Sequence, residues 1–575
     1  MSALSYTFSW SAPSRQLIDI CFEITGNQQP ELLVRLPFWR PGRYEAGNFA
    51  RNMLNLKAET GDGGSLSAVK QSKESWLIDA GNSDHIKISY QYYASELNAG
   101  STYLDAEQLY VNPVNCCLFI RERMEEPCEV ILTVPENYQI ASDLKCGSSP
   151  TRLLADNFDR LADAPFIASP HLQHNSFEVN AHTFHLWFMG KVNVPMEKVT
   201  ADFHAFCEVQ LDMMGKLPGN EYHFLFQILP VSFYHGVEHT YSTVCALGPG
   251  PVVFNTEFYN EFLGVSSHEL FHAWNVKKIR PSEMSPYDLT TENFSRLGWV
   301  NEGITTYYGD QFLIRSGVFS LDTFLKTFND KLKKHFVNYG RFNQPVSEAS
   351  FDTWIDGYVP GIPHRKTSIY TEGSLCAFML DMLIREHSSE HFSLDDLMRK
   401  LYTDAQQGTA YSRERLFALL NGFATYDFEG FYATYIEGTG DYEPLLRSML
   451  DRVGLTLVDS FPYSIPEHAF GFTVSESGGF ATVSLVAPGS PAEHAGMMTG
   501  DQFIACNGTR IRANLPLLAG SSQTVRLQLF SKEQLKEVVL TATSDRFFAA
   551  RTVRLNSSPS ENQRNAFNYW IGSSS

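Results

Sequence analysis

The stretch His268-Glu-Leu-Phe-His272 decides how this sequence folds, and Trp299-Val-Asn-Glu-Gly303 completes it. Residues four apart on a helix share a face, so the side chains of His268 and His272 can reach one metal ion. Glu302, in a second helical pattern, supplies a candidate third ligand. Two histidines and one glutamate leave a coordination position of zinc open, which distinguishes a catalytic site from a structural one. The spacing therefore predicts a catalytic zinc centre, with one Zn²⁺ per chain.

Glu269 lies one step round the helix from His268 and need not bind the metal itself. From there it can take a proton from a water activated by zinc and return that proton to the leaving amine. This arrangement predicts the hydrolysis of peptide bonds. We expect the zinc helix to begin at Ser266-Ser267, because short hydroxyl side chains suit a helix entrance, and to end before Pro281.

Composition places the chain among ordinary globular proteins of several domains. It has 575 residues, of which 43% are hydrophobic and 19% charged, enough for about three or four domains on the usual length prior. The net charge of −19, with no compensating block of Lys and Arg, disfavours nucleic acid and anionic membrane surfaces as partners. The aromatic content of 13% suits packing in β-rich domains.

The nine cysteines are scattered and form no C-x-x-C pair, so we expect buried free thiols rather than a disulfide framework or a zinc ribbon. The first residues lack the basic and apolar regions of a secretory signal. No run approaches the roughly 20 apolar residues that cross a bilayer. These features predict a soluble, cytoplasmic protein, or a periplasmic one if a signal has been trimmed.

Patterning along the chain predicts a multidomain α+β protein. Residues 1–165 alternate apolar and polar side chains, as in His85–Tyr93, and read as an antiparallel β domain. Residues 166–460 begin with strands and continue as helices that carry the metal motif, which indicates a mainly helical catalytic domain with a small sheet. The pattern returns to strands in 461–548, and we expect the aromatic end, 549–575, to pack on the body.

The segment 461–548 contains Ser490-Pro-Ala-Glu-His-Ala-Gly496 and, shortly after it, Gly500-Asp501. This order of strand, short helix, strand and Asn-Gly turn resembles a PDZ domain. The resemblance implies that Phe470, Gly471 and Phe472 form the loop that binds a terminal carboxylate. A peptide C-terminus is therefore a possible partner of this domain.

The run His235-Gly-Val-Glu-His239 ends a strand-like stretch upstream of the zinc helix. A strand in this position can pair its backbone with an extended substrate, so Gly236 and Val237 are candidate substrate-binding residues. Glu238 can hold a free α-ammonium group through a charge-assisted hydrogen bond. The expected substrates are therefore peptides with a free amino terminus.

Tyr370, in Ile369-Tyr-Thr-Glu-Gly373, stands at the opening of a long apolar helix. Its hydroxyl can donate a hydrogen bond to the oxyanion that develops during hydrolysis, a role that needs a preorganised donor. An ordinary core tyrosine is the alternative, and the residues alone favour that alternative.

Together these motifs resemble the glycyl aminopeptidase family, zinc peptidases that carry a PDZ domain. The matching residues are Ser267–Pro281, Trp299–Gly303, Tyr370–Gly373 and the N-terminal run Leu36–Tyr44. The resemblance implies a thermolysin-like (gluzincin-type) catalytic domain, the roles of Tyr370 and Glu238, and a preference for N-terminal glycine and, less, alanine. The chain departs from the motifs of the related larger zinc aminopeptidases, as with His239 in place of Asn.

The sequence thus predicts a zinc-dependent aminopeptidase that favours small N-terminal residues. Two alternatives stay open. One is a zinc endopeptidase whose PDZ domain recruits substrates, and the other is a PDZ peptide-binding protein with an inactive metal domain. Cleavage of blocked peptides would favour the endopeptidase. An absence of hydrolysis both in the presence and in the absence of a chelator would favour the peptide-binding protein.

Overall fold

The computed structural model describes residues 3–459, 465–477, 480–511 and 522–572, and its helices and strands fall into two units. The first unit contains the chain up to residue 320, including the predicted metal ligands, and two later segments. The second contains the strand-rich C-terminal part. Their residue ranges are 1–320, 350–358 and 384–426 for the first unit, and 321–349, 359–383 and 427–575 for the second.

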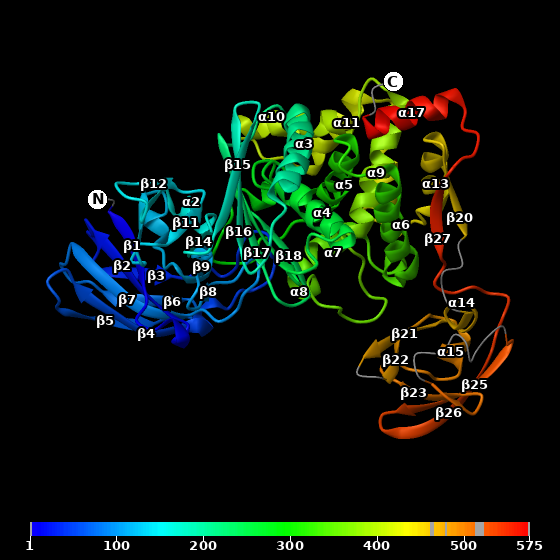
Figure 1. The fold of residues 1–575 in the computed structure, drawn as a ribbon, viewed down its shortest axis with the longest axis horizontal. Coiled ribbons are helices and arrows are strands. Elements are labelled where there is room, and N and C mark those ends of the chain that lie inside the picture. The colour runs from blue at the N-terminus through cyan, green and yellow to red at the C-terminus, as the bar shows by residue number, and fades with distance from the viewer. Residues whose placement is uncertain (1–2, 460–464, 478–479, 512–521, 573–575) are drawn as a thin grey trace. The chain divides into compact units, whose positions relative to one another are not determined.

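Alternating burial builds two sheets at the N-terminal end of the first unit, drawn in blue and cyan in Figure 1. In β7 (His85–Tyr93), every second side chain is buried, because successive residues of a strand point to opposite faces. The larger sheet has the order β12-β13-β10-β1-β2-β7-β4-β5-β6-β3, and the smaller β11-β14-β9-β8. Pairing is antiparallel apart from β1 with β10. The β-rich N-terminal domain is confirmed.

The elements of this domain, in chain order, are β1 (Leu4–Ser9), β2 (Leu17–Thr25), β3 (Glu31–Arg35), β4 (Met53–Thr60), β5 (Ser65–Lys70), β6 (Ser75–Asp79), β7, β8 (Tyr103–Leu104), β9 (Leu109–Val111), α1 (Pro113–Cys116), β10 (Cys128–Leu132), β11 (Gln139–Ser142), β12 (Lys145–Cys146), β13 (Arg152–Ala155), α2 (Phe158–Ala162) and β14 (Phe166–Ser169).

A five-stranded sheet stands between this domain and the helices of the first unit (Figure 1). Its order is β15 (Gln173–Val179), β16 (His182–Met189), β17 (Glu221–Ile228), β19 (Ser242–Gly248) and β18 (Phe233–Glu238), so β18 lies at an edge. In β17, Phe224 and Phe226 pack against α3 and α4. Leu225, on the opposite face, packs in a cluster with Tyr110 of the N-terminal domain.

The helices of the first unit make up the predicted helical middle region, which is confirmed. They are α3 (Met196–Met214), α4 (Thr256–His272), a π-helical turn η5 (Trp299–Ile304), α5 (Thr305–Arg315), α8 (Thr353–Asp356), α10 (Leu394–Gln406) and α11 (Arg413–Phe423). Two helices, α7 (Val346–Phe351) and α9 (Thr371–His387), contribute residues to both units.

The prediction that the zinc helix begins at Ser266-Ser267 is wrong. Helix α4 begins ten residues earlier, at Thr256, and Ser266 and Ser267 lie buried in its interior. The Ser266 hydroxyl donates to the carbonyl of Phe262 one turn back (2.7 Å), and the Ser267 hydroxyl donates to Gly309 of α5 (2.9 Å). Small hydroxyl residues suit a helix entrance, but they also suit a close contact between two helices, and the second reason applies here.

The second unit combines helices with two C-terminal sheets. The helices are α6 (Leu321–Val337), α12 (Phe428–Tyr435), α13 (Glu443–Arg452), α14 (Ile465–Phe470), α15 (Pro491–His494) and α17 (Glu561–Ile571). The two-stranded sheet pairs β20 (Leu455–Asp459) with β27 (Arg551–Leu555). The larger sheet contains β21 (Phe472–Ser477), β22 (Phe480–Val486), β23 (Gln502–Cys506), β24 (Thr509–Arg510), β25 (Thr524–Ser531) and β26 (Gln534–Thr541).

This larger sheet and its own apolar cluster occupy the segment 461–548, for which the PDZ assignment stays a prediction. Residues 551–571 contain a strand and a helix: β27 pairs with β20, and buried Trp570 of α17 packs edge-on against Phe324 and tilted against Phe378. All nine cysteines are free thiols, and all but Cys21 and Cys146 are buried. Within the described residues, no helix has both the length and the apolar character to cross a membrane.

Candidate metal centre

Two helices of the first unit bring His268, His272 and Glu302 together. The Nε2 atom of His272 lies 3.3 Å from Oε2 of Glu302, and that of His268 lies 3.6 Å from the same oxygen. The two Nε2 atoms are 3.0 Å apart. Close packing of α4 on α5 permits this, because a Cβ on Gly309 of α5 would already stand 3.3 Å from the Cβ of His268.

Glu302 lies in the π-helical turn η5, where the sequence predicts an ordinary helix. A π turn is rare and shifts the residues that follow around the helix axis, and it is often found at functional sites. The side-chain amide of Asn275 donates hydrogen bonds to oxygen atoms at this turn. It donates to the carbonyls of Val300 (2.8 Å) and Asn301 (3.2 Å) and to Oγ1 of Thr305 (3.0 Å).

Asn275 also orients a candidate ligand, a role that the sequence does not predict. Its backbone carbonyl oxygen lies 2.7 Å from Nδ1 of His272 and can only accept, so Nδ1 carries a proton and donates. Nε2, which lies 3.3 Å from Glu302, is then the ring nitrogen left to bind a metal ion. Such outer hydrogen bonds fix the tautomer of metal-binding histidines. The only sequence signal is that Asn275 follows His272 by three residues.

The charges around these three side chains favour a cation. Burial by itself lowers the pKa of His272, but Glu302 and Glu238 outweigh burial and raise that pKa to about 10. Burial by itself raises the pKa of Glu302, but His272 and His268 hold it at about 2. The buried group of donors therefore stabilises positive charge. With two imidazole nitrogens and a carboxylate oxygen within 4.8 Å of one another, the donor set fits zinc.

Glu269 lies beside this group, and the absence of a side chain at Gly236 makes room for it. A Cβ on Gly236 would stand 2.1 Å from Oε1 of Glu269, far inside ordinary contact. Glu269, Glu238 and His272 form a second group whose ligand atoms lie within 4.8 Å of one another. Burial raises the pKa of Glu269 well above its usual value. A carboxylate with a raised pKa is suited to exchanging protons near neutral pH.

The edge strand β18 places Glu238 next to His272. Glu238 is 4% exposed, and among the described residues its Oε1 has no hydrogen-bond partner. Gly42, from the N-terminal run Leu36–Tyr44, approaches the other oxygen so closely that a Cβ there would lie 2.6 Å away. The backbone N–H of His239 donates to Ser242 across the hairpin. The backbone N–H and C=O groups of successive strand residues point alternately to the two sides of the strand. Those of Gly236 and Glu238 therefore point to the open edge of β18, away from β19.

Val237 differs from its two neighbours. Its side chain is buried in the apolar cluster that joins the sheet to the N-terminal domain, and its carbonyl accepts from the hydroxyl of Thr243 on β19. Its backbone and side chain are therefore both directed away from the open edge, so the prediction that Val237 binds substrate is not supported.

His239, which replaces the Asn of the related motif, faces the N-terminal domain. Its Nδ1 lies 3.1 Å from a carboxylate oxygen of Asp163, and the ammonium of Lys277 lies 2.7 Å from the same oxygen. Burial opposes the charge of Asp163, but Lys277 and His239 outweigh it and lower the pKa of that carboxyl below its usual range. This buried ion pair fixes the segment after α4 to the N-terminal domain.

The other predicted site residues lie in the second unit. Tyr370 is partly buried and immediately precedes α9, and its carbonyl accepts from the backbone N–H of Ser374. Phe470 and Phe472 are buried in the apolar cluster of the larger C-terminal sheet, and Gly471 between them has a φ of 73°. The carbonyl of Gly471 accepts from the N–H of Ala487. The roles of these residues stay predictions.

Comparisons with known proteins agree with this architecture. The family model of the Peptidase M61 N-terminal domain matches residues 5–170, and that of the M61 glycyl aminopeptidase matches residues 261–376. The comparison with curated proteins gives no match. The solved structure of an aminopeptidase N family protein from Idiomarina loihiensis is similar over 99% of this chain and 100% of its own, with 24% identity and a TM-score of 0.90. The two therefore share their fold.

An M1 zinc metallopeptidase from Deinococcus radiodurans is similar over 76% of this chain and 94% of its own, with 14% identity and a TM-score of 0.48. The matches to the two family domains, one on the N-terminal sheets and one spanning the candidate metal ligands, decide the family. The chain belongs to the M61 peptidases.

Proposed function

We propose that this peptidase is a zinc-dependent aminopeptidase that removes the first residue of peptides with a free amino terminus. The observation that carries the proposal is the convergence of His268, His272 and Glu302 with two further buried carboxylates, Glu269 and Glu238, beside them. The first three residues would bind the zinc ion. Glu269 would transfer protons, and Glu238 would recognise the amino group of the substrate.

His268, His272 and Glu302 would hold one zinc ion. Zinc bound there supplies Lewis acidity, which makes water more acidic and polarises the carbonyl of the substrate. The remaining steps belong to the side chains of the chain itself. The backbone carbonyl of Asn275 keeps the ring of His272 in the ligating tautomer.

Glu269 acts as the general base and then as the general acid. It takes the proton of the attacking water, and it passes that proton to the amine that leaves. The buried position and the raised pKa of its carboxyl support this role. The space left by Gly236 supports it further, since the carboxyl group extends into that space.

Glu238 restricts the enzyme to amino termini. A buried carboxylate with an unpaired oxygen is costly unless a charged or polar group pairs with it, and the α-ammonium of a substrate is such a group. The open edge of β18 supports backbone pairing with the same substrate. An extended peptide on this edge would present its first peptide bond to the metal ligands.

Two finer parts of the proposal rest mainly on the sequence and the family. Tyr370 would donate a hydrogen bond to the developing oxyanion. The preference for glycine is supported by the family model, whose description is a glycyl aminopeptidase, and the lesser preference for alanine rests on the resemblance in sequence alone. A second proposed function is the binding of a peptide C-terminus by the segment 461–548, because its run Phe470–Phe472 resembles the carboxylate loop of PDZ domains.

The experiment that tests the proposal compares Glu269→Gln with Glu261→Gln, which makes the same change at an exposed position of the same helix. Glu269→Gln should keep its zinc and lose about 10²- to 10⁴-fold in kcat on glycyl-nitroanilide, the usual contribution of a general base. Glu261→Gln should resemble wild type. Wild-type turnover by Glu269→Gln would refute the mechanism.

A further inference from the structure

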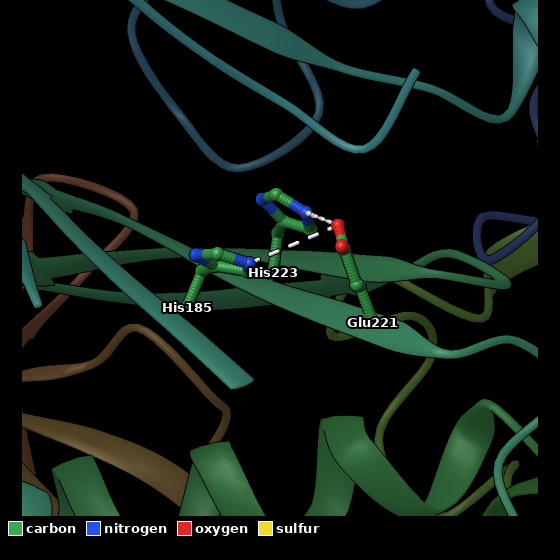
Figure 2. A group of neighbouring side chains, drawn as sticks. All are labelled: His185, Glu221 and His223. Atoms are coloured by element: carbon green, nitrogen blue, oxygen red, sulfur yellow. Dashed lines mark ion pairs between the residues drawn. The ribbon is translucent and has the colours of Figure 1, made fainter. Parts of the chain in front are cut away.

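A second group of metal-binding side chains lies on the five-stranded sheet, away from the residues described above. His185 of β16 and His223 of β17 are paired neighbours in the parallel register of the two strands. Glu221 precedes His223 by two residues, so both side chains project from the same face of β17. Figure 2 shows the two imidazole rings side by side with the carboxylate of Glu221 beside them.

The distances suit ligands that share a small cation. Oε2 of Glu221 lies 3.8 Å from Nε2 of His185 and 3.8 Å from Nε2 of His223. The rings are stacked, with centroids 4.4 Å apart. Ligand atoms about 2.0–2.2 Å from a tetrahedral zinc lie about 3.3–3.6 Å from each other. The side chain of Glu221 is 61% exposed, so it is free to close the remaining few tenths of an ångström.

The nitrogen of His185 that faces this group is unused. Its Nε2 is buried and has no hydrogen-bond partner among the described residues. Its other nitrogen, Nδ1, lies 3.1 Å from Nε2 of His174 on β15. When Nδ1 donates to His174, Nε2 presents its lone pair toward Glu221.

His223 differs from His185 because it accepts a hydrogen bond from a tryptophan, Trp187. The indole N–H of Trp187 donates to Nδ1 of His223 (3.2 Å), so the neutral ring carries its own proton on Nε2. A metal at Nε2 displaces that proton, Nδ1 gains one from solvent, and the indole must release its hydrogen bond. Trp187 also stacks on His174, with centroids 3.7 Å apart. Metal binding should therefore change the fluorescence of Trp187.

We propose that His185, Glu221 and His223 form a second zinc-class site that joins β16 to β17. Two imidazoles and one carboxylate favour zinc over the oxygen-seeking ions Ca²⁺ and Mg²⁺. The site is independent of the proposed peptidase centre, because it shares none of its residues or elements. A cation bound there stabilises the folded chain, since the unfolded chain lacks the paired strands that bring the ligands together.

The test measures bound zinc in the full-length protein after equilibration with buffered free zinc. Wild type should bind two ions per chain, and His185→Gln and Glu221→Gln should each bind one. His182→Gln is the control, because His182 lies on the same strand but bonds to Gly219 outside the group. His272→Gln should lose the ion of the peptidase centre and keep this one, so failure of either site is recognised separately.

Two further measurements keep the proposal testable if a variant loses stability. Zinc should change the tryptophan fluorescence of His272→Gln, and the added substitution Trp187→Phe should remove that change. Zinc should also raise the melting temperature of His272→Gln but not that of the double variant His185→Gln/His272→Gln. Two zinc ions per chain in folded His185→Gln, or a fluorescence change that survives Trp187→Phe, would overturn the proposal.

Discussion

Gly236→Ala is the perturbation whose effect follows most directly from the structure. The added Cβ would stand 2.1 Å from Oε1 and 2.6 Å from Cδ of Glu269, whereas ordinary contact begins at 3.4 Å. The carboxyl group must therefore move by about 1.3 Å, the difference between the 2.1 Å to Oε1 and the 3.4 Å of ordinary contact. A misplacement of about 1 Å costs a catalytic group on the order of 10²-fold in rate, or about 2.7 kcal/mol of transition-state stabilisation.

The assay compares kcat/KM on glycyl-nitroanilide, zinc content and melting temperature for Gly236→Ala and Gly264→Ala. Gly264 lies in α4, and a Cβ there would meet nothing within 4 Å. Gly264→Ala should keep its activity and gain up to about 1 kcal/mol in stability, because alanine favours a helix over glycine. Gly236→Ala should lose about 100-fold in kcat/KM with its zinc retained. Full activity with full zinc would refute the argument that Glu269 needs this space.

Three further predictions concern residues other than the candidate metal ligands. Asn275→Ala should lower zinc affinity by about 10- to 100-fold, measured by competition with a chelator, because η5, which carries Glu302, loses the side-chain amide that donates to the carbonyls of Val300 and Asn301, whereas the backbone carbonyl that holds His272 is retained. Asp163→Asn should destabilise the chain by about 3–5 kcal/mol, since Lys277 is left buried and unpaired. Because the pKa of Asp163 is depressed in the folded chain, its contribution is present above the unfolded value of about 3.9 and is lost as pH falls below it, which acid titration of wild type and Asp163→Asn will measure. Tyr370→Phe should lower kcat by about 10²- to 10³-fold with little change in KM, as the loss of one oxyanion donor does.

Local periodicity made much of the fold predictable. The strand at His85–Tyr93 is observed with the predicted bounds because its apolar residues alternate strictly. The pairing of His268 with His272 follows from four-residue spacing on one helix, and it needs no knowledge of the rest of the chain. Glu302 was predicted to join them, but not the π turn that carries it, since that turn depends on Asn275 from another segment.

Features that depend on distant contacts were not predictable. The start of α4 was misplaced because Ser266 and Ser267 serve a helix contact with Gly309, which sequence spacing does not reveal. The direction of Val237 depends on which face of β18 meets the N-terminal domain. His185 and His223 are far apart in sequence, and only the parallel register of β16 and β17 makes them neighbours.

The central claim is that one zinc ion and a free amino terminus are both required for hydrolysis. The most direct measurement follows the cleavage of matched peptides, free and acetylated at an N-terminal glycine, by chelator-treated and zinc-restored enzyme. The account predicts release of glycine from the free peptide alone, and only after zinc is restored. Equal cleavage of the acetylated peptide, or cleavage that persists in the zinc-free enzyme, would contradict it.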